Sequence, residues 1–339
     1  MTAKEIAKAI GVSEATVSLV VNGKPGISDK TRKMVVEKIN DLGYGYLLHK
    51  QTKEDKGRSL GFVLFKNRGE LLGMNSFFPL ILEGIEARAR DDGYSLTVLN
   101  VERQSIREQA AHIREANCAG FVIFATELQP EDLDEFEALD LPFVVLDNEL
   151  LGRKQSYVKV NNMQGTYLAV RHLYEHGHRK IGYLSSGLQI SSFLERQRCA
   201  VVAGEMFGLP DMRQYIYPIG YPNEIAEVGM EELLSKVKRG DLPTAFLADN
   251  DLVAAGAMLA LRAKGYRIPE DFSLVGYDDR PICTMMQPKL TTVQLPPDAF
   301  GRIAVGHLIS MLRNDWVEDI VVEVNCRLIE RETVGPPQE

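Results

Sequence analysis

The sequence IAKAIGVSEATVSLVVN, residues 6–22, predicts two short helices joined by a tight turn. The first helix carries an apolar stripe with the 3.6-residue period of a helix, formed by Ile6, Ala7 and Ile10. Gly11 stands at the corner, where a residue without a Cβ atom adopts a positive φ at little cost. Ser13 is placed to cap a second helix, whose apolar residues would pack back on the first: Val17, Val20 and Val21.

The spacing within this stretch matches a known DNA-binding motif. Counted from Ala7, the residues Gly11, Val17 and Val20 lie four, ten and thirteen positions further on. This is the spacing of the helix-turn-helix motif, whose second helix lies in the major groove of DNA. Two packed helices of any small bundle would share part of the pattern, because short helical pairs are common. The stretch alone therefore favours DNA binding without establishing it.

A third helix and a polar linker follow the pair. Ser28 is placed to cap a helix whose apolar positions repeat at i, i+4 and i+7: Val35, Ile39 and Leu42. We therefore expect a three-helix head over residues 1–43 and a hinge over residues 44–58. Residues 1–60 carry 11 Lys and Arg against 7 Asp and Glu, whereas the remaining 279 carry 28 against 40. The overall net charge of −8 is therefore the sum of +4 for residues 1–60 and −12 for the rest of the chain. The positive charge of the first segment is suited to binding the phosphates of DNA.

From Ser59 onward, predicted strands alternate with predicted helices. Short apolar runs such as residues 60–65, 120–124 and 143–146 read as buried strands, and amphipathic segments lie between them. This alternation indicates βαβ units and parallel sheets that helices cover on both faces. Residues 59–333 are too many for one doubly wound sheet, so we expect two α/β lobes with a cleft between them.

Composition excludes several other classes of protein. The chain has 339 residues, of which 45% are hydrophobic, and no apolar run approaches the ~18 residues of a membrane span. We see no secretory leader, and the scattered cysteines suit reduced thiols in the cytoplasm: Cys118, Cys199, Cys283 and Cys326. Neither GxGxxG nor GxxxxGK[ST] occurs, and His172 and His176 lack a third metal ligand. We therefore expect no cofactor, no metal site and no enzymatic activity.

Segments along nearly the whole chain resemble one family. These are GVSEATVSLVVNGKPGISDKTRKMVVEKINDLGY (11–44), NSFFPLILEGIE (75–86), LPFVVLD (141–147), RHLYEHGHRKIGYL (171–184), FLADNDLVAAGAM (246–258), IPEDFSLVGYDD (268–279) and KLTTV (289–293). In collinear order they are similar to the LacI/GalR family of bacterial transcription regulators. The resemblance implies a homodimeric, cytoplasmic and nucleoid-associated repressor that binds double-stranded operator DNA. Its periplasmic-binding-protein-like core would clamp a small effector, with a sugar or sugar derivative favoured over a purine.

The resemblance also implies domain boundaries. The chain would pass between the lobes near residues 160, 291 and 318. The N-lobe would comprise residues 59–160 and 292–318, and the C-lobe residues 161–291 and 319–333, before a tail of residues 334–339. A solute-binding protein with the same core but no DNA role is the main alternative, and the basic head and missing leader argue against it.

The expected DNA contacts come from the second helix and its surroundings. Glu14, Ala15 and Leu19 form its outer face, and the matching positions in the family touch base edges. Leu19 offers apolar contact only, for instance to a thymine methyl, whereas Glu14 either accepts from a cytosine amine or is a solvated helix charge. The further candidates are polar residues around the docking face: Thr2, Ser13, Thr16, Ser18, Asn22, Ser28, Thr31 and Arg32. Ser13 and Ser28 are also explained as helix caps.

The hinge departs from the family pattern. Relatives carry Pro-Asn after the Gly-Tyr pair and then a small helix that wedges a leucine into the minor groove. Here Tyr44 is followed by Gly45, and the wedge position falls near Lys53. Either Leu47 or Leu48 replaces the wedge, or a charged hinge lies along the DNA backbone without kinking it.

The candidate effector residues follow predicted strands. Ligands of α/β sheets bind beyond the carboxyl ends of the strands, where Asp147, Asn250 and Asp278 stand. Helix capping explains Asp251 better than Asn250. Arg196 matches the effector arginine of the family, and its planar fork suits vicinal hydroxyls or a carboxylate. The remaining candidates are aromatic residues: Phe77, Phe78, Phe193 and Tyr221. For Phe77 and Phe78, a role in the hydrophobic core is the rival interpretation. Leu295 and Pro297 stand where relatives carry polar or aromatic contacts.

Overall fold

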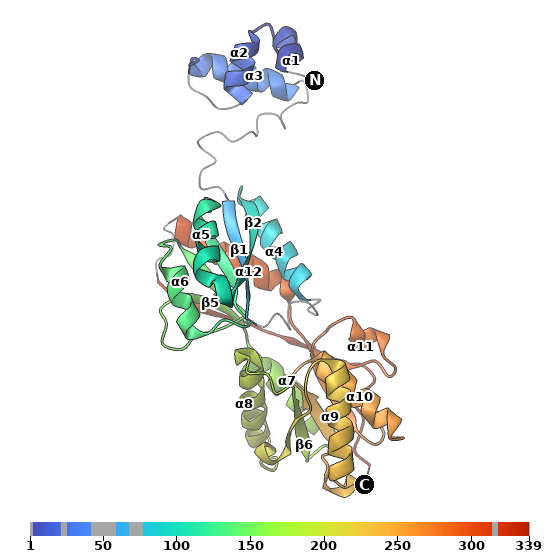
Figure 1. The fold of residues 1–339 in the computed structure, drawn as a ribbon. Helices are drawn as coiled ribbons and strands as arrows, with labels where there is room; N and C mark the ends of the chain where they lie inside the picture. The colour runs from blue at the N-terminus through green and yellow to red at the C-terminus, as the bar shows by residue number, and fades with distance from the viewer. Residues whose placement is uncertain (1–2, 22–25, 42–58, 68–76, 314–317, 339) are drawn as a thin grey trace.

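A small three-helix unit begins the chain. The computed structural model describes residues 3–21, 26–41, 59–67, 77–313 and 318–338. Helices α1 (Ala3–Ile10), α2 (Glu14–Val21) and α3 (Asp29–Asp41) pack around an apolar core, at the blue end of the ribbon in Figure 1. The core consists of buried residues spaced as the helical period predicts: Ile6, Ala7, Ile10, Val17, Val20, Val35 and Ile39. The predicted hinge, residues 44–58, lies outside the described residues.

Local chemistry fixes the ends of these helices. Gly11 adopts φ +74° between α1 and α2, as the turn requires. The Ser13 hydroxyl accepts a hydrogen bond from the Thr16 backbone N–H at 3.0 Å, and the Ser28 hydroxyl accepts one from Thr31 at 3.2 Å. Both predicted caps are confirmed. Each one satisfies a donor that the first turn of a helix leaves without a partner.

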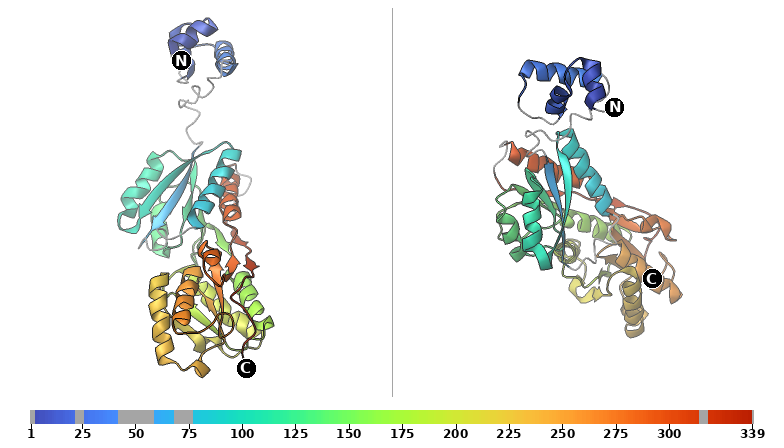
Figure 2. Two further views of the ribbon diagram at one scale, coloured as in Figure 1. Left: turned by 90° about the vertical axis from the view of Figure 1, so that its right-hand side faces the viewer. Right: turned by 45° about the horizontal axis from the view of Figure 1, so that its top comes forward.

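The N-lobe is built on a parallel sheet of six described strands in the order β11-β5-β4-β3-β1-β2. The strands are β1 (Ser59–Lys66), β2 (Ser95–Glu102), β3 (Gly120–Phe124), β4 (Phe143–Leu146), β5 (Ser156–Val160) and β11 (Val321–Val324). The helices are α4 (Phe77–Asp91), α5 (Ile106–Glu115), α6 (Leu133–Glu137) and α12 (Pro297–Leu312), with short 3₁₀ turns at η3 (Arg103–Ser105) and η4 (Pro130–Asp132). Figures 1 and 2 show helices on both faces of this sheet, as the alternating pattern predicts.

The C-lobe repeats the architecture with the strand order β12-β10-β9-β8-β6-β7. The strands are β6 (Ile181–Ser185), β7 (Ile216–Pro218), β8 (Ala245–Ala248), β9 (Ser273–Asp278), β10 (Thr291–Gln294) and β12 (Arg327–Ile329). The helices are α7 (Asn162–Glu175), α8 (Ser191–Met206), α9 (Asn223–Lys236), α10 (Asp251–Ala263) and α11 (Ile282–Met285), with 3₁₀ turns at η5 (Met212–Tyr215) and η6 (Arg239–Asp241). The pairing of β10 with β12 is antiparallel, and the other pairings in this sheet are parallel.

Sheet membership shows where the chain passes between the lobes. Strand β10 pairs with β9 of the C-lobe as far as Gln294, and β11 pairs with β5 of the N-lobe as far as Val324. The chain therefore passes after Val160, after Gln294 and after Val324, whereas the sequence predicts the last two passages near 291 and 318. Each passage comes later because a whole strand is completed in its own sheet before the chain leaves it.

Two glycines allow α4 and α12 to approach closely in the N-lobe. A Cβ atom on Gly84 would overlap the carbonyl oxygen of Asp298, and one on Gly301 would overlap that of Ile81. Sequence analysis does not predict α12, whose helical pattern is weakened by Gly301 and Gly306. The same small residues are what let its backbone pack against α4.

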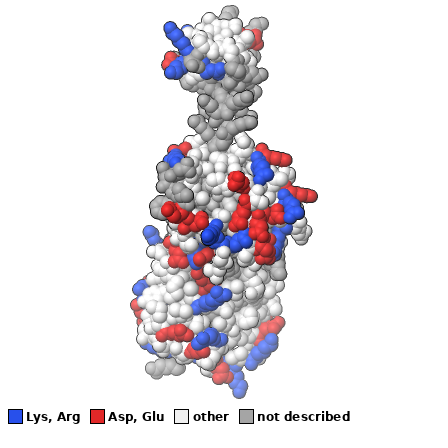
Figure 3. Space-filling view, turned by 90° about the vertical axis from the view of Figure 1, so that its left-hand side faces the viewer, with Lys and Arg blue, Asp and Glu red and all other residues white. Residues whose placement is uncertain are grey.

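The surface of the core carries charges of both signs. Arg103 pairs with Glu131 at 2.6 Å, and Arg107 pairs with Glu135 at 2.9 Å. Figure 3 shows acidic and basic side chains side by side on one face of the core. All four cysteines are buried and none forms a disulfide with another. Within the described ranges, no helix combines the length and the apolar character needed to cross a membrane.

Candidate DNA-binding face and effector cleft

The outer face of α2 is exposed as predicted at Glu14 and Ala15 but not fully at Leu19. Glu14, Ala15 and Ser18 are exposed, and Leu19 is half-buried. Val17 and Val20 on the opposite side are buried in the three-helix core. The outer face of α2 therefore offers one carboxylate, one hydroxyl and two apolar side chains to a partner.

The polar candidates around α2 divide into two groups. Ser13 and Thr16 stand at the start of α2, with their hydroxyls 2.7 Å apart. Ser28 and Thr31 stand at the start of α3, with their hydroxyls 2.8 Å apart. The exposed N-terminal ends of α2 and α3 are suited to phosphate oxygens, because backbone N–H groups and the helix dipole favour an anion there. Arg32 on α3 is half-buried. Three further candidates lie outside the described residues: Thr2, Asn22 and Lys53.

The cleft between the lobes collects residues at the carboxyl ends of strands. Asp147 follows β4, Asp249 and Asn250 follow β8, and Asp278 ends β9. Asp147 and Asp278 have φ of +70° and +106°, conformations that cost free energy in residues other than glycine. Asn117, Asp140 and Asp279 also have positive φ, so this conformation alone does not distinguish Asp147 and Asp278 as ligand residues.

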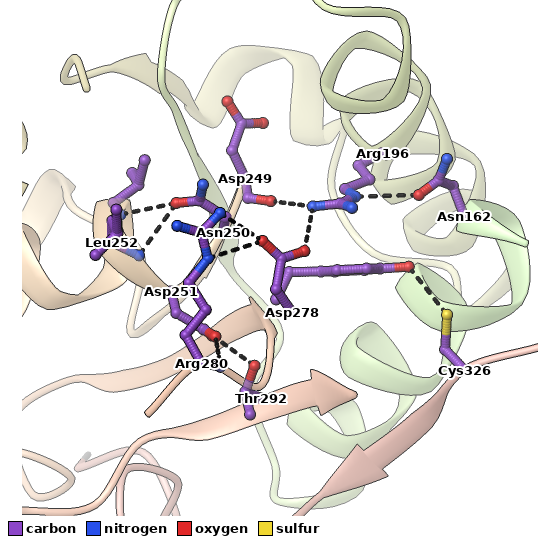
Figure 4. Close-up of polar contacts among 12 residues, drawn as sticks. Asn162, Arg196, Asp249, Asn250, Asp251, Leu252, Asp278, Arg280, Thr292 and Cys326 are labelled. Atoms are coloured by element: carbon purple, nitrogen blue, oxygen red, sulfur yellow. Dashed lines mark hydrogen bonds and ion pairs between the residues drawn. The ribbon is translucent and has the colours of Figure 1, made fainter. Parts of the chain in front are cut away.

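Arg196 on α8 is buried, and Figure 4 shows its side chain between Asn162, Asp249 and Asp278. Its Nε donates to Asn162 Oδ1 at 3.0 Å, and its Nη1 donates to the Asp249 carbonyl oxygen at 2.8 Å. The guanidinium lies 3.8 Å from the ring centroid of Tyr277, a cation–π contact. Burial lowers the pKa of Arg196, but Asp278 and its other neighbours raise it by more, so the net pKa lies above its ordinary value. The group is therefore a fixed positive charge.

Asp278 is held between two arginines. Its Oδ1 lies 3.2 Å from Arg196 Nη1, and its Oδ2 lies 3.2 Å from Arg280 Nη2. All three side chains are nearly buried. The cleft therefore contains a desolvated carboxylate with two guanidinium partners, and a ligand hydroxyl could exchange with any of these contacts.

The cap of α10 is Asn250, which corrects the sequence-based assignment to Asp251. Asn250 Oδ1 accepts from the backbone N–H groups of Leu252 and Val253 at 3.1 Å. Asp251 instead accepts from the Arg280 backbone N–H and the Thr292 hydroxyl, at 2.7 and 2.5 Å. Asn250 has the extended conformation of a cap, whereas Asp251 already lies inside the helix. The Asn250 Nδ2 is buried without a hydrogen-bond partner among the described residues.

Asp147 faces a cavity of about 350 Å³, here called the Asp147 cavity. The Thr126 hydroxyl donates to Asp147 Oδ2 at 2.6 Å. Burial raises the pKa of Asp147 to about 6, against the opposing effects of Thr126 and Arg196. The Asp147 carboxylate thus has a hydroxyl as its hydrogen-bond donor, whereas Asp278 has two guanidinium partners. Asp147 is therefore suited to a ligand that donates hydrogen bonds.

A second cavity of about 250 Å³ lies beside Asp278. Its lining includes Arg280, Gln294 and Arg331, with Leu80, Leu295 and Pro297 as apolar residues. The two replacements noted in the sequence, Leu295 and Pro297, thus form part of this wall. They give it an apolar surface.

The aromatic candidates have different positions. Phe78 stacks on Phe62 with ring centroids 6.0 Å apart and packs against the N-lobe core, so the structure favours its core role. Phe77 begins α4, and its side chain lies outside the described residues. Phe193 and Tyr221 belong to a small apolar cluster, and the Arg196 guanidinium lies 5.5 Å from the Phe193 ring centroid.

Sequence reasoning missed several residues that the fold brings to the cleft. Arg280 stands two positions after Asp278, and its place in the run DDR was the available signal. Asn162 and Lys159 escaped because β5 was not predicted, since Lys159 interrupts the apolar run SYVKV. Glu195 adjoins Arg196, but its contact with Asn162 at 2.6 Å depends on how α7 and α8 pack. In the described part, no group of three or more His, Cys, Asp or Glu side chains is arranged to hold a metal ion.

These features define a class: a helix-turn-helix head joined to a two-lobed core with a polar cleft is the architecture of a ligand-responsive DNA-binding regulator. Comparisons with known proteins give the family. The profile described as "Bacterial regulatory proteins, lacI family" matches residues 2–45, and that of the "Periplasmic binding protein-like domain" matches residues 170–334. The chain belongs to the lacI family of transcription regulators.

Individual relatives are similar over nearly the whole chain. The HTH-type transcriptional repressor PurR of Mannheimia succiniciproducens is 27% identical, over 98% of each chain. A structure of the lac repressor dimer bound to operator and the anti-inducer ONPF is 26% identical over 99% of each chain, with a TM-score of 0.72. The regulator CelR in complex with cellobiose shares the fold, at 24% identity over 98% of this chain and 99% of that one, with a TM-score of 0.72. These relatives are named as regulators rather than enzymes.

Proposed function

We propose that this regulator binds operator DNA as a homodimer and that a sugar or sugar derivative in the interlobe cleft controls its DNA affinity. The observation that carries the proposal is the buried Arg196, which joins Asp278 to the ends of two other elements in the cleft. Its forked donors and the paired carboxylate match the vicinal hydroxyls of a sugar ring. Asn250 adds an amide whose Nδ2 has no acceptor among the described residues, which leaves it for a ligand oxygen.

A purine is the second candidate, and the structure offers it less support. A flat base needs aromatic faces on which to stack. Phe78 is engaged with Phe62 in the N-lobe core, and the wall beside Asp278 is formed by Leu295 and Pro297. Hydrogen-bonding groups predominate around Arg196, which favours a polyhydroxyl ligand.

The control mechanism follows from the position of the cleft. A ligand that contacts both lobes favours one lobe arrangement over another and so shifts the population of the protein. In a dimer, such a shift changes the spacing of two heads on a pseudo-palindromic operator. The operator-bound lac repressor dimer, similar over 99% of this chain, supports both the dimer and the DNA partner. A DNA partner in bacteria also supports a cytoplasmic, nucleoid-associated location.

The heads would read DNA through the outer face of α2. Ala15 and Leu19 offer apolar contact, and Glu14 offers an acceptor for a cytosine amine. The helix starts at Ser13 and Ser28 would contact phosphates and so fix the docking register. A solute-binding role without DNA is the alternative, and the lacI-family match over residues 2–45 argues against it.

A ligand screen tests the proposal. We expect one member of a panel of sugars and purines to raise the melting temperature of the full chain, because a ligand that binds only the folded state stabilises it. The expected ligand is a sugar, and Asp278→Asn should abolish the shift. Asp211→Asn, at a half-buried site in the C-lobe that lines no cavity beside Asp278, is the matched control and should leave it unchanged. A shift given only by purines, or one that persists in Asp278→Asn, would contradict the proposal.

A further inference from the structure

A nearly buried ammonium group of the N-lobe contacts a carboxylate of the C-lobe. Lys159 stands on β5, one residue before Val160, after which the chain first passes between the lobes. Its Nζ donates to Glu195 Oε1, on α8 of the C-lobe, at 3.0 Å. A cation that loses water on burial must be compensated by close anionic partners. One of the partners of Lys159 thus comes from the other lobe.

The pair of Lys159 and Glu195 differs from the other ion pairs of the described residues. Each of the others joins two side chains of one lobe. A hydrogen bond from Ser191 to Asn148 at 2.6 Å also runs from one lobe to the other, but it joins neutral groups. Direct ion pairing between the described parts of the lobes therefore depends on Lys159 and Glu195.

The other two partners of Lys159 belong to its own lobe. Its Nζ lies 2.6 Å from Glu149, in the loop after β4, and 3.4 Å from Glu323, the residue of β11 that is paired with Lys159 in the sheet. Arg198 lines the same cavity but lies on α8 together with Glu195, so it does not join the lobes. When the lobes separate, Lys159 keeps Glu149 and Glu323 and loses only Glu195.

Glu195 is held in place from within the C-lobe. Asn162, at the start of α7, donates through Nδ2 to Glu195 Oε2 at 2.6 Å and accepts from Arg196 through Oδ1 at 3.0 Å. Each oxygen of the Glu195 carboxylate therefore has a donor. A side chain that is already oriented loses less conformational entropy when it forms an ion pair.

The surroundings make this pair stronger than an ordinary surface ion pair. The side chain of Lys159 is 11% exposed and that of Glu195 is 35% exposed, so water screens their attraction only in part. Burial lowers the pKa of Lys159, but Glu149 and Glu195 raise it by more, so the net pKa lies above its ordinary value and the group stays charged. Glu149 and Glu323 also repel Glu195, which limits the gain. The pair therefore biases the arrangement of the lobes without fixing it.

We propose that Lys159 and Glu195 form an ionic latch that holds the lobes in the arrangement of this structure before any effector binds. The latch goes beyond the proposed function, because it acts without ligand and without DNA. Breaking it would shift the population toward chains with separated lobes. The latch thereby sets the starting population on which an effector acts.

Single-molecule fluorescence energy transfer on the full chain tests the latch. Glu115→Cys in the N-lobe and Gln214→Cys in the C-lobe would carry the two dyes, since both positions are exposed and the four native cysteines are buried. An excess of unlabelled protein leaves at most one labelled chain in each dimer. We expect Glu195→Gln to lower the ratio of joined to separated lobes by at least about threefold.

Two matched variants distinguish the latch from a general loss of charge. Glu149→Gln and Glu323→Gln neutralise the partners of Lys159 within the N-lobe. We expect each to leave the ratio unchanged or to raise it, because a carboxylate that repels Glu195 is removed. Lys159→Met should lower the ratio at least as much as Glu195→Gln, and the double variant should lower it no further. If Lys159→Met does not fold, Glu195→Gln decides the test, since Lys159 keeps two partners there.

The results separate the latch from the proposed function. A ratio that Glu195→Gln leaves unchanged, or that Glu323→Gln lowers equally, would overturn the latch. A single distribution that no variant shifts would overturn it too. These measurements involve neither sugar nor DNA, so the proposed function would stand. Absence of any Asp278-dependent sugar binding would contradict the proposed function and leave the latch standing.

Discussion

At the scale of single residues, side chains with several partners hold the core together and shape its cleft. Arg196 contacts Asn162, Asp249 and Asp278 from one guanidinium. Arg196 and Asp278 could be identified from the sequence. Arg196 matches the effector arginine of the family, and Asp278 follows a predicted strand. The sequence could not identify their partners, because Asn162 and Asp249 meet Arg196 only after three elements have packed together. The wrong assignment of the α10 cap to Asp251 has the same cause. Asn250 and Asp251 are neighbours after a strand, and the sequence does not show at which of the two the helix starts.

Replacing Arg196 with lysine tests this geometry. Arg196→Lys keeps the charge, but a single ammonium cannot donate to Asn162, Asp249 and Asp278 with the spacing of the fork. We expect the free energy of unfolding to fall by about 2–4 kcal/mol and sugar-induced stabilisation to disappear. Urea denaturation with and without ligand measures both. Arg213→Lys, at an exposed site in the C-lobe, is the control, and an equal effect there would contradict this account.

A buried histidine should make stability depend on pH. His178 contacts Thr244 at 2.8 Å and Ser273 at 2.9 Å, and burial lowers its pKa from 6.5 to about 4. Because the unfolded chain takes up the proton first, stability is full above pH 6.5 and is lost as the pH falls toward 4. The expected loss between pH 7.5 and pH 5.0 is about 2 kcal/mol.

Urea denaturation of wild type and His178→Asn at both pH values isolates this effect. Burial raises the pKa values of Asp147 and Asp251 to about 6 and about 7, and these groups change stability in the opposite direction. They are common to both proteins, so only the difference between the proteins reports on His178. The variant should lose about 2 kcal/mol less than wild type. Equal losses would show that His178 is not the group responsible.

At the scale of elements, long periodic helices and short apolar strands were predictable, and interrupted ones were not. The strands β1, β3 and β4 contain continuous apolar runs that match their predicted ranges closely. Strand β5 was missed because Lys159 breaks its pattern, and α12 was missed because Gly301 and Gly306 weaken its helical pattern. In both cases tertiary packing stabilises an element that the local sequence does not predict. Lys159 forms ion pairs with carboxylates, and Gly301 packs against the backbone of α4.

The close approach of α4 and α12 gives an element-scale prediction. Gly84→Ala would force the two helices apart, because a Cβ atom there overlaps the Asp298 carbonyl oxygen. We expect the free energy of unfolding to fall by about 1–3 kcal/mol in urea denaturation. Gly240→Ala is the matched control, since a Cβ atom at Gly240 meets open space. A Gly84→Ala protein as stable as this control would mean that the helices can separate freely.

At the scale of the whole molecule, the lobes share one cleft, and the head precedes it in the chain. The two-lobed α/β architecture followed from the alternation of strands and helices, but the passages after Gln294 and Val324 depend on which sheet each strand joins. The strand that completes each sheet comes from a distant part of the sequence. Neither local periodicity nor composition could show that assignment.

The altered hinge gives a prediction at this scale. We propose that Lys50, Lys53, Lys56 and Arg58 contact the DNA backbone in place of a leucine wedge. Neutralising all four should flatten the dependence of DNA affinity on salt, because each lost phosphate contact removes about 0.9 from the log–log slope. Titration by fluorescence anisotropy at several salt concentrations measures the slope. An unchanged slope would contradict these contacts.

The most direct test of the central claim is the affinity of the full chain for its operator with and without saturating sugar. The operator would be selected from random duplexes, and the sugar would be the one that stabilises the protein. We predict that the sugar changes the Kd for the operator at least about tenfold in wild type and in Asp211→Asn, and leaves it unchanged in Asp278→Asn. Equal operator affinity with and without bound sugar in the wild-type protein would contradict the account.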